Sequence, residues 1–519
     1  MKEVEFLKKK HLFLILLFHL AAWFALKPVW PFSDDYWYTY YSHQFLSGDF
    51  HITYNQFQNR FGVYVPAGIL IGLLGISPYA IALWPLLLSC LTIVFVFFLV
   101  KKITNTQIAL MCSFLIATNT LQLTYAIALF PDLIVSFYCI GSVLILYYGR
   151  QANDQKIHYP ILLNLFLLIG LLTKETILLI MPFLLLILLH DLIRKRHYLF
   201  WIRTFLYGIC SALVFFFTFY ILTGDAFFRI RSLWAFDHSG FFTKADEALV
   251  KARYSSSILK WLNSELGYLF ILIMAAFSLY KLRLKSIHEF PVYMTVYALV
   301  LLSEYILLFH TGKYGVLFRV DRLWMLILAP LCILSAIEIF KGKNSFYFYL
   351  MGLLLILSVY NYYAVSLTRS LLSGFFLITV AAAYYLKRKN TNWKFLLLLP
   401  FFTLSFYFLF CNSNYRIGSL QSGSLIKTRI ELLSKSGKKT ILCAEDFADN
   451  HIIYNAFNEY PNLTFYPFSK YDSLNKITNP LNKISNSLNR IPDLYIIVNT
   501  EKTAVPDFIS NFPDYWKSF

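Results

Sequence analysis

The stretch YPILLNLFLLIGLLTKETILLIMPFLLLILLHDLIRKR, residues 159–196, contains two apolar runs that are separated by Thr173, Lys174 and Glu175. A helix rises about 1.5 Å per residue, so runs of about 15 to 18 residues approach the ~30 Å thickness of the hydrocarbon core of a bilayer. A basic cluster, residues 194–196, closes the second run. The pattern predicts two membrane-crossing helices that are joined by a short polar turn on one side of the membrane.

The same pattern extends over most of the chain. Of the 519 residues, 58% are hydrophobic and only 14% are charged, whereas soluble proteins carry roughly a quarter charged residues. The composition excludes an ordinary soluble globular protein. It predicts a mainly α, polytopic helical membrane protein of about thirteen transmembrane helices, at residues 11–29, 79–100, 107–125, 132–149, 159–173, 176–193, 202–222, 266–280, 291–309, 323–340, 346–365, 371–386 and 394–411.

The formal charge of +18 lies in short clusters between the apolar runs rather than on one face of a polar domain. This distribution argues against a nucleic-acid partner and in favour of contact with membrane lipids. Because Lys and Arg in short loops favour the cytoplasm, the clusters predict an integral plasma (inner) membrane protein with a cytoplasmic N-terminus and an uncleaved first span. The clusters are residues 8–10, 101–102, 150–156, 194–196, 281–285, 341–343 and 387–389.

The chain is expected to have two domains. Residues 1–411 form the transmembrane domain, with long outward loops at 30–78 and 223–265, and the apolar segment 61–76 is expected to lie at the interface or to re-enter the membrane. Residues 412–519 change abruptly to polar composition. They are expected to form a small, extracytoplasmic, soluble α/β domain with strands at 440–444, 463–466 and 494–498 and a helix at 424–436.

Two adjacent carboxylates stand where the first span leaves the membrane, in the sequence PFSDDYWY at residues 31–38. A pair such as Asp34 and Asp35 can divide proton removal from cation or hydroxyl binding, and the aromatic side chains around it can stack on sugar rings. The alternative is structural, because Ser-Asp-Asp is also a good helix start. Further along the same loop lie residues 47–49, Ser-Gly-Asp, and Arg60.

At these residues the chain resembles the GT-C-type membrane glycosyltransferases, in particular the branch of protein O-mannosyltransferases and aminoarabinose transferases of lipid A. The acidic pair, the Ser-Gly-Asp turn, Arg60 and the turn at 74–77 match, although the second acid is commonly Glu and is Asp35 here. Phe-Pro-Asp at 130–132 and Leu-Thr-Lys-Glu at 172–175 match further motifs of that branch. Residues 318–322, Phe-Arg-Val-Asp-Arg, resemble a later motif of that branch. Val320 stands where the motif has an aromatic residue.

The resemblance implies a sugar donor linked to polyprenyl (undecaprenyl or dolichyl) phosphate and a glycan, lipid or protein acceptor. It implies an inverting transfer of a hexosyl or pentosyl group with Asp34 as general base, supported by Asp35 and Asp132. Asp35 and Asp132 are also the residues expected to hold a divalent metal ion, if one is used. The residues expected to bind the donor and its phosphate are Arg60, Lys174, Glu175, Arg319 and Arg322.

Each of these residues also has an ordinary interpretation. Asp132 follows a proline and can simply open a helix, and Lys174 with Glu175 can be an interfacial pair. Because neighbouring residues of a helix do not share a face, Lys174 and Glu175 are expected to meet different partners. Arg229 and Arg231 in the second outward loop can bind a lipid phosphate, an anionic acceptor or lipid headgroups.

Two other functions fit a chain with many spans and few intramembrane charges. A secondary transporter or flippase predicts broken helices near the membrane centre and repeated halves. A lipid-linked glycan ligase or polymerase predicts an outer loop rich in Arg and His, and residues 223–265 keep that possibility open. The distinctive acids lie at the predicted outer ends of spans, which favours chemistry at the membrane surface.

Overall fold

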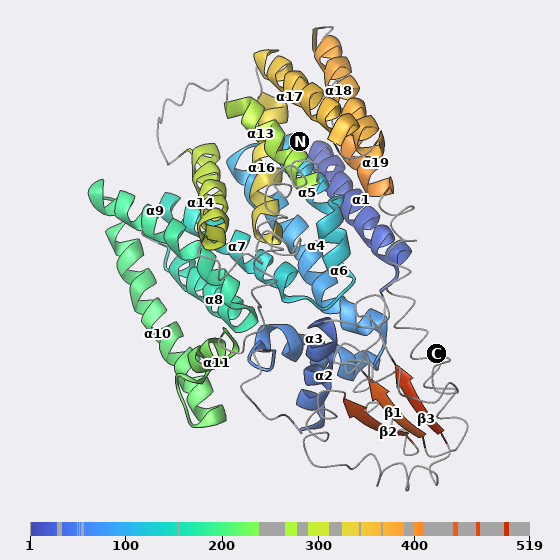
Figure 1. Ribbon diagram of the computed structural model, residues 1–519. Helices are drawn as coiled ribbons and strands as arrows, with labels where there is room; N and C mark the ends of the chain where they lie inside the picture. The colour runs from blue at the N-terminus through green and yellow to red at the C-terminus, as the bar shows by residue number, and fades with distance from the viewer. Residues whose placement is uncertain are drawn as a thin grey trace. The chain divides into compact units, whose positions relative to one another are not determined.

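The computed structural model describes the apolar helices and the core of the C-terminal sheet (Figure 1). The residues it describes are 2–28, 34–48, 50, 52, 57–152, 156–237, 265–277, 289–310, 324–341, 344–364, 367–388, 399–407, 440–444, 463–467 and 493–497.

Every predicted apolar segment contains a helix, and the fold class is confirmed as a polytopic helical membrane fold. By length and composition, five of the described helices can each cross a membrane, or six if one bent pair counts as a single span. The helices in the apolar segments are α1 (Lys2–Leu26), α4 (Pro78–Ile103), α5 (Thr106–Ala117), α6 (Thr120–Ala126), α7 (Pro131–Gln151), α8 (His158–Thr173), α9 (Met181–Ile193), α10 (Tyr198–Thr223), α13 (Glu265–Phe277), α14 (Phe290–His310), α16 (Met325–Lys341), α17 (Asn344–Ala364), α18 (Leu367–Arg388) and α19 (Leu399–Tyr407).

Among the described residues, three further helices lie in the predicted outward loops: α2 (Asp34–Ser47), α3 (Phe61–Leu74) and α11 (Phe228–Asp237). The chain divides into two compact units. The first contains residues 1–28, 51–67 and 82–413, and the second contains residues 29–50, 68–81 and 414–519. The division of the chain into domains 1–411 and 412–519 stays a prediction.

Helix α7 is the core helix of the first unit, because every residue of its apolar window is buried. Pro131 occupies the first turn, where its missing N–H and fixed φ suit a helix start. Asp132 follows in the same turn and Arg150 lies in the last turn, so each charge opposes the partial charge at its end of the helix dipole. About 27 Å separate these two residues along the axis, close to the hydrocarbon thickness of a bilayer.

The Arg150 end of α7 is joined to α9 and α10 by a buried ion pair. The Arg150 guanidinium donates to both carboxylate oxygens of Asp191, at 2.7 and 2.6 Å. Trp201 Nε1 adds a third hydrogen bond to Asp191 at 2.9 Å. Both charged side chains are almost fully buried, so the pair links the three helices at the end that the sequence predicts to be cytoplasmic.

The predicted span at 107–125 is a broken helix rather than a continuous one. Helices α5 and α6 meet at an angle of 58°, because the Asn119 side chain accepts hydrogen bonds from the backbone N–H groups of Leu121 and Gln122 and starts a new helix. His19 Nδ1 donates to the Ala117 carbonyl oxygen at 2.9 Å, and Ser405 Oγ donates to the Thr118 carbonyl oxygen. These side chains satisfy backbone groups that the break would otherwise leave unpaired in an apolar environment.

The expected interfacial segment at 61–76 forms helix α3, and its GxxxG motif packs against α2 within the second unit. A Cβ on Gly68 would lie 2.9 Å from the Ser42 carbonyl oxygen, and one on Gly72 would lie 3.2 Å from Leu46 Cδ2. Glycine is therefore required at the first position and favoured at the second, as expected for small residues at a close helix contact.

The three predicted C-terminal strands are present as β1 (Thr440–Ala444), β2 (Leu463–Pro467) and β3 (Asp493–Ile497). They form a parallel sheet in the order β2-β1-β3, in which Thr440 pairs with Leu463 on one side and with Asp493 on the other. Parallel neighbours require crossover connections, which agrees with the expected α/β arrangement. The predicted helix at 424–436 lies outside the described residues.

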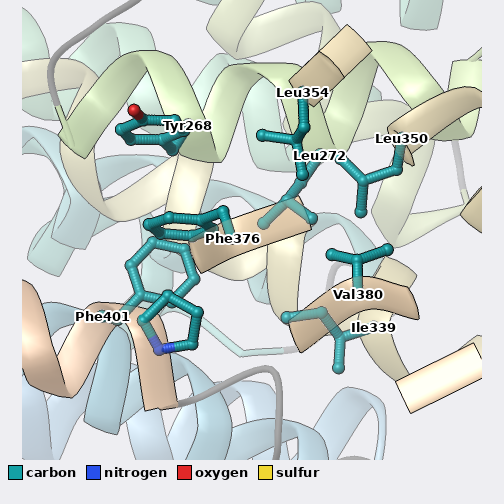
Figure 2. Close-up of a pocket in the computed structure, with 9 residues that line it drawn as sticks. Tyr268, Leu272, Ile339, Leu350, Leu354, Phe376, Val380 and Phe401 are labelled. Atoms are coloured by element: carbon teal, nitrogen blue, oxygen red, sulfur yellow. The ribbon is translucent and has the colours of Figure 1, made fainter. Parts of the chain in front are cut away.

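A small apolar pocket lies among α13, α16, α17, α18 and α19 (Figure 2). Tyr268 stacks on Phe376 with ring centroids 4.5 Å apart, and Phe401 meets Phe376 edge-on at 5.3 Å. Leu272, Leu350, Val380 and their neighbours complete an aliphatic lining. The pocket is a packing feature of α13 and the helices from α16 to α19.

We expect Asp191→Asn to lower the free energy of unfolding by about 3 to 5 kcal/mol, because it leaves the buried Arg150 guanidinium without a counter-charge. Thermal unfolding of the purified protein in detergent measures the change. Arg231→Ala is the control, since the Arg231 side chain is 64% exposed and pairs with Asp225 at the surface, where an ion pair contributes at most about 1 kcal/mol. Equal effects of the two substitutions would contradict the structural role of Asp191.

Candidate functional site

Five charged side chains gather at the end of α7 opposite to Arg150. They come from four segments of the chain, since Lys174 and Glu175 are adjacent, and all belong to the first unit. The five are Arg60 before α3, Asp132 in the first turn of α7, Lys174 after α8, Glu175 at the start of the 3-10 helix η1 (Glu175–Ile180), and Arg229 in α11. We call this group the charge cluster.

Asp132 and Lys174 form the inner pair of the charge cluster, with Lys174 Nζ 2.6 Å from Asp132 Oδ1. Both side chains are at least nine-tenths buried. The pair forms because α7 and α8 are antiparallel neighbours, so the start of one lies beside the end of the other. Lys174 has an extended backbone (φ −162°, ψ 141°), which ends α8 and turns its side chain toward α7.

Glu175 meets two arginines. Arg60 Nη2 donates to Oε1 and Arg229 Nη2 donates to Oε2, both at 2.8 Å. Lys174 and Glu175 therefore meet different partners, as the sequence predicted. A carboxylate has enough lone pairs for both bonds, and hydrogen bonds between charged groups are about twice as strong as neutral ones.

Burial and charge together define what the charge cluster can bind. Arg60, Asp132, Lys174 and Arg229 are buried, whereas the Glu175 side chain is 27% exposed. Among the described residues, these three cations and two carboxylates leave one net positive charge. A site of this kind, largely withdrawn from water, favours an anion over a cation.

An apolar wall borders the charge cluster. Phe215, Phe219 and Phe228 form a buried core, against which Phe61 and Leu172 pack. Phe61 and Phe228 are chain neighbours of Arg60 and Arg229, and Leu172 lies two residues before Lys174. Apolar surroundings lower the local dielectric constant and strengthen each ion pair.

Close packing fixes the backbone that carries Arg60. A Cβ on Gly62 would overlap the Thr173 hydroxyl, so the start of α3 can approach the end of α8 only with glycine there. Asn59 Nδ2 donates to Ser232 Oγ at 3.1 Å, and Ser232 Oγ donates to the Arg229 carbonyl oxygen at 2.8 Å. These contacts link the segment before α3 to α11 and bring Arg60 and Arg229 to the same carboxylate.

The structure brings together four of the predicted site residues, Arg60, Asp132, Lys174 and Glu175. Asp34 and Asp35 open α2 in the second unit, with Asp35 buried. The side chain of Asp34 lies outside the description. Arg319 and Arg322 also lie outside the described residues, so their donor-binding roles stay predictions.

Metal binding by Asp35 and Asp132 is not supported by a ligand cluster in the part of the chain described. No three His, Cys, Asp or Glu side chains there lie close enough together to hold a metal ion. Asp132 binds an ammonium group, and Asp35 belongs to the other compact unit. The metal ion stays a prediction.

Arg229 is the charge-cluster residue that sequence reasoning did not include among the site residues. Its position in an outward loop indicated only an anionic partner, and the structure supplies that partner as Glu175. Arg231, two residues later, instead pairs with Asp225 at 3.2 Å and is exposed. The pattern of the loop gave no signal that separates these two arginines, because they differ only in which face of α11 they occupy.

Comparison with known proteins places the fold. No family model matches the chain, and no characterised protein matches it by sequence. The chain is similar to the crystal structure of ArnT from Cupriavidus metallidurans in the apo state, with a TM-score of 0.55 and 12% identity over 88% of this chain and 84% of that one. The structure of the same protein bound to undecaprenyl phosphate gives a TM-score of 0.54 and 12% identity over 89% and 90%.

A weaker likeness links the chain to the oligosaccharyltransferase of Archaeoglobus fulgidus in the apo form, with a TM-score of 0.46 and 14% identity over 77% of this chain and 55% of that one. At these identities the similarity to ArnT is one of fold. The resemblance to GT-C-type membrane glycosyltransferases that the motifs indicated is confirmed at that level.

We expect Lys174→Met to lower the free energy of unfolding by about 3 to 5 kcal/mol, since it leaves the buried Asp132 carboxylate without its ammonium partner. The double variant Asp132→Asn with Lys174→Met should recover part of this loss, because neither charge remains. Thermal unfolding of the wild type, both single variants and the double variant gives the coupling between the two residues. Additive losses would show that the two side chains do not depend on each other.

Proposed function

We propose that this integral membrane protein is a glycosyltransferase that moves a sugar from a polyprenyl phosphate to an acceptor on the extracytoplasmic side. The observation that carries the proposal is the charge cluster, which is buried, cationic overall and assembled within a fold shared with ArnT. One ArnT structure contains undecaprenyl phosphate, which is the class of lipid that such a donor would release.

The charge cluster suits a lipid phosphate for two reasons. Guanidinium groups bind phosphate oxygens through directed, charge-assisted hydrogen bonds. Arg60 and Arg229 supply two guanidinium groups. Lys174 precedes Glu175 in the chain, and its ammonium group adds a positive charge to the cluster. When the glycosidic bond to phosphate breaks, negative charge grows on the phosphate oxygen, and fixed positive charges stabilise it.

The transfer step then needs a base for the acceptor. Asp34 takes the proton from the acceptor hydroxyl, whose oxygen forms a bond to the anomeric carbon from the side opposite to the phosphate. The carbon–oxygen bond to the phosphate breaks, and its electron pair remains on the phosphate oxygen. The products are an inverted glycoside, a protonated Asp34 and a polyprenyl phosphate, with Asp35 and Asp132 as supporting acids.

The predicted topology agrees with chemistry outside the cytoplasm. The charge cluster and the Arg150 pair lie at opposite ends of α7, and the basic clusters of the sequence assign the Arg150 end to the cytoplasm. The charge cluster then faces the extracytoplasmic side, where sugars carried by a membrane lipid become available. The sequence predicts that residues 412–519 are extracytoplasmic as well, which makes them a candidate for acceptor recognition.

A transporter or flippase is the second candidate, because the broken helix α5–α6 is a feature that such proteins use. In transporters the unwound backbone usually lines a cavity or binds the substrate. Here the carbonyl groups at the break accept hydrogen bonds from His19 and Ser405. Side chains of the protein itself thus satisfy the carbonyl groups at the break, which favours a glycosyltransferase over a transporter.

We expect Asp34→Asn to reduce sugar transfer by at least about a hundredfold, because the amide cannot accept the acceptor proton. Purified protein in nanodiscs, radiolabelled polyprenyl phosphate sugars and a panel of acceptors provide the measurement, with release of the lipid phosphate as readout. Asp225→Asn makes the same chemical change at a residue that pairs with Arg231 and should retain wild-type transfer. Wild-type rates in Asp34→Asn would remove Asp34 as the base.

We expect Arg60→Ala to weaken binding of the lipid-linked donor by about ten- to a hundredfold, which corresponds to the loss of a charge-assisted hydrogen bond of about 1.5 to 3 kcal/mol. Binding is measured by titration of a short-chain polyprenyl phosphate sugar. Arg231→Ala removes the same side chain from the exposed face of α11 and is the matched control. Equal donor affinity in Arg60→Ala and the wild type would contradict a phosphate contact by Arg60.

A further inference from the structure

Glu175 occupies the place in the charge cluster where an anion is best held. Its two oxygens each accept one guanidinium N–H, from Arg60 and from Arg229, both at 2.8 Å. The two arginines come from segments far apart in the sequence, and their like charges repel each other unless an anion lies between them. The carboxylate therefore does for these arginines what a bound phosphate would do.

Glu175 is also the most accessible member of the charge cluster. Its side chain is 27% exposed, compared with 6% for Arg60 and 4% for Arg229. An anion that approaches the arginines therefore reaches the carboxylate before it reaches the guanidinium groups behind it. Binding of a second anion at the same place brings two negative charges together, which is unfavourable unless the carboxylate moves away.

We propose that Glu175 is a built-in competitor for the donor phosphate, which must displace the Glu175 carboxylate from Arg60 and Arg229 in order to bind. The inference rests on the proposed function, because it assigns the role of one residue in the same site. In the ligand-free protein the carboxylate keeps the two guanidinium groups in place. During turnover it can return to them and help the product lipid phosphate to leave.

A role in competition has a consequence that a purely structural role does not share. Removing the negative charge of Glu175 raises the net charge of the cluster from +1 to +2 and frees two guanidinium groups for the ligand. The affinity for a lipid phosphate should then rise. If Glu175 only held the arginines in place, its removal would disorder them and the affinity would fall.

The test compares the affinity of the full chain in nanodiscs for farnesyl phosphate, a short prenyl phosphate without a sugar, between the wild type and Glu175→Gln. We expect binding to become about tenfold tighter in the variant, a change of about 1.4 kcal/mol. Steady-state transfer should show a lower KM for the donor together with a lower kcat, because release of the lipid phosphate becomes slower. Unchanged or weaker binding in Glu175→Gln would overturn the proposal.

A second variant keeps the test decisive if Glu175→Gln folds poorly. Glu175→Asp retains the charge but withdraws the carboxylate by one methylene, so it competes less well and should tighten farnesyl phosphate binding by a smaller factor. Inorganic phosphate should raise the Tm of both variants more than that of the wild type, since it replaces a carboxylate that is absent in Glu175→Gln and withdrawn in Glu175→Asp. Arg231→Ala should behave as the wild type, and a phosphate response equal in all four proteins would refute the competition.

Failure of this inference can be separated from failure of the proposed function. Sugar transfer by the wild type depends on the proposed function alone. Tighter binding in Glu175→Gln without any transfer activity in the wild type would leave a phosphate-binding site of another purpose. Transfer by the wild type without tighter binding in the variant would retain the enzyme and remove the competition.

Discussion

Lys174 and Asp132 meet 2.6 Å apart because a charge at the end of an apolar helix must find an opposite charge when water is excluded. The same constraint pairs Arg150 with Asp191 at the other end of α7. Helix α7 is buried along its whole apolar window, so neither of its charged ends can turn to solvent. Lys174 at the end of α8 and Asp191 in α9 supply the opposite charges that the two ends of α7 require.

The charged residues at the two ends of α7 find their opposite charges in different ways. At the Arg150 end, one cation and one carboxylate form a neutral, fully buried pair with Trp201. At the Asp132 end, three cations share two carboxylates, and one of these carboxylates is partly open to solvent. The neutral Arg150–Asp191 pair stabilises the helix packing, whereas the net positive charge of the charge cluster favours an anion.

The residues near the charge cluster show how much could be predicted before the structure was known. The Thr-Lys-Glu turn between two apolar runs indicated that Lys174 and Glu175 lie together at one end of their spans, and the proline before Asp132 indicated a helix start. Local sequence carries such information because it depends on spacing and capping alone. The break of one predicted span at Asn119 was not predicted, since the short polar run Thr118, Asn119 and Thr120 does not show by itself that Asn119 will cap a new helix.

The sequence by itself determined the order of the apolar segments, the strands of the C-terminal sheet and the residue types available at each helix end, because these follow from hydrophobic periodicity and charge placement. Only the tertiary structure decided that Arg229 rather than Arg231 joins Arg60 on Glu175, and that Lys174 pairs with Asp132. The physical reason is that pairing depends on helix rotation and on close contacts such as that of Gly62 with Thr173. These pairs join residues that are 42, 54 and 115 positions apart, where no local pattern records them.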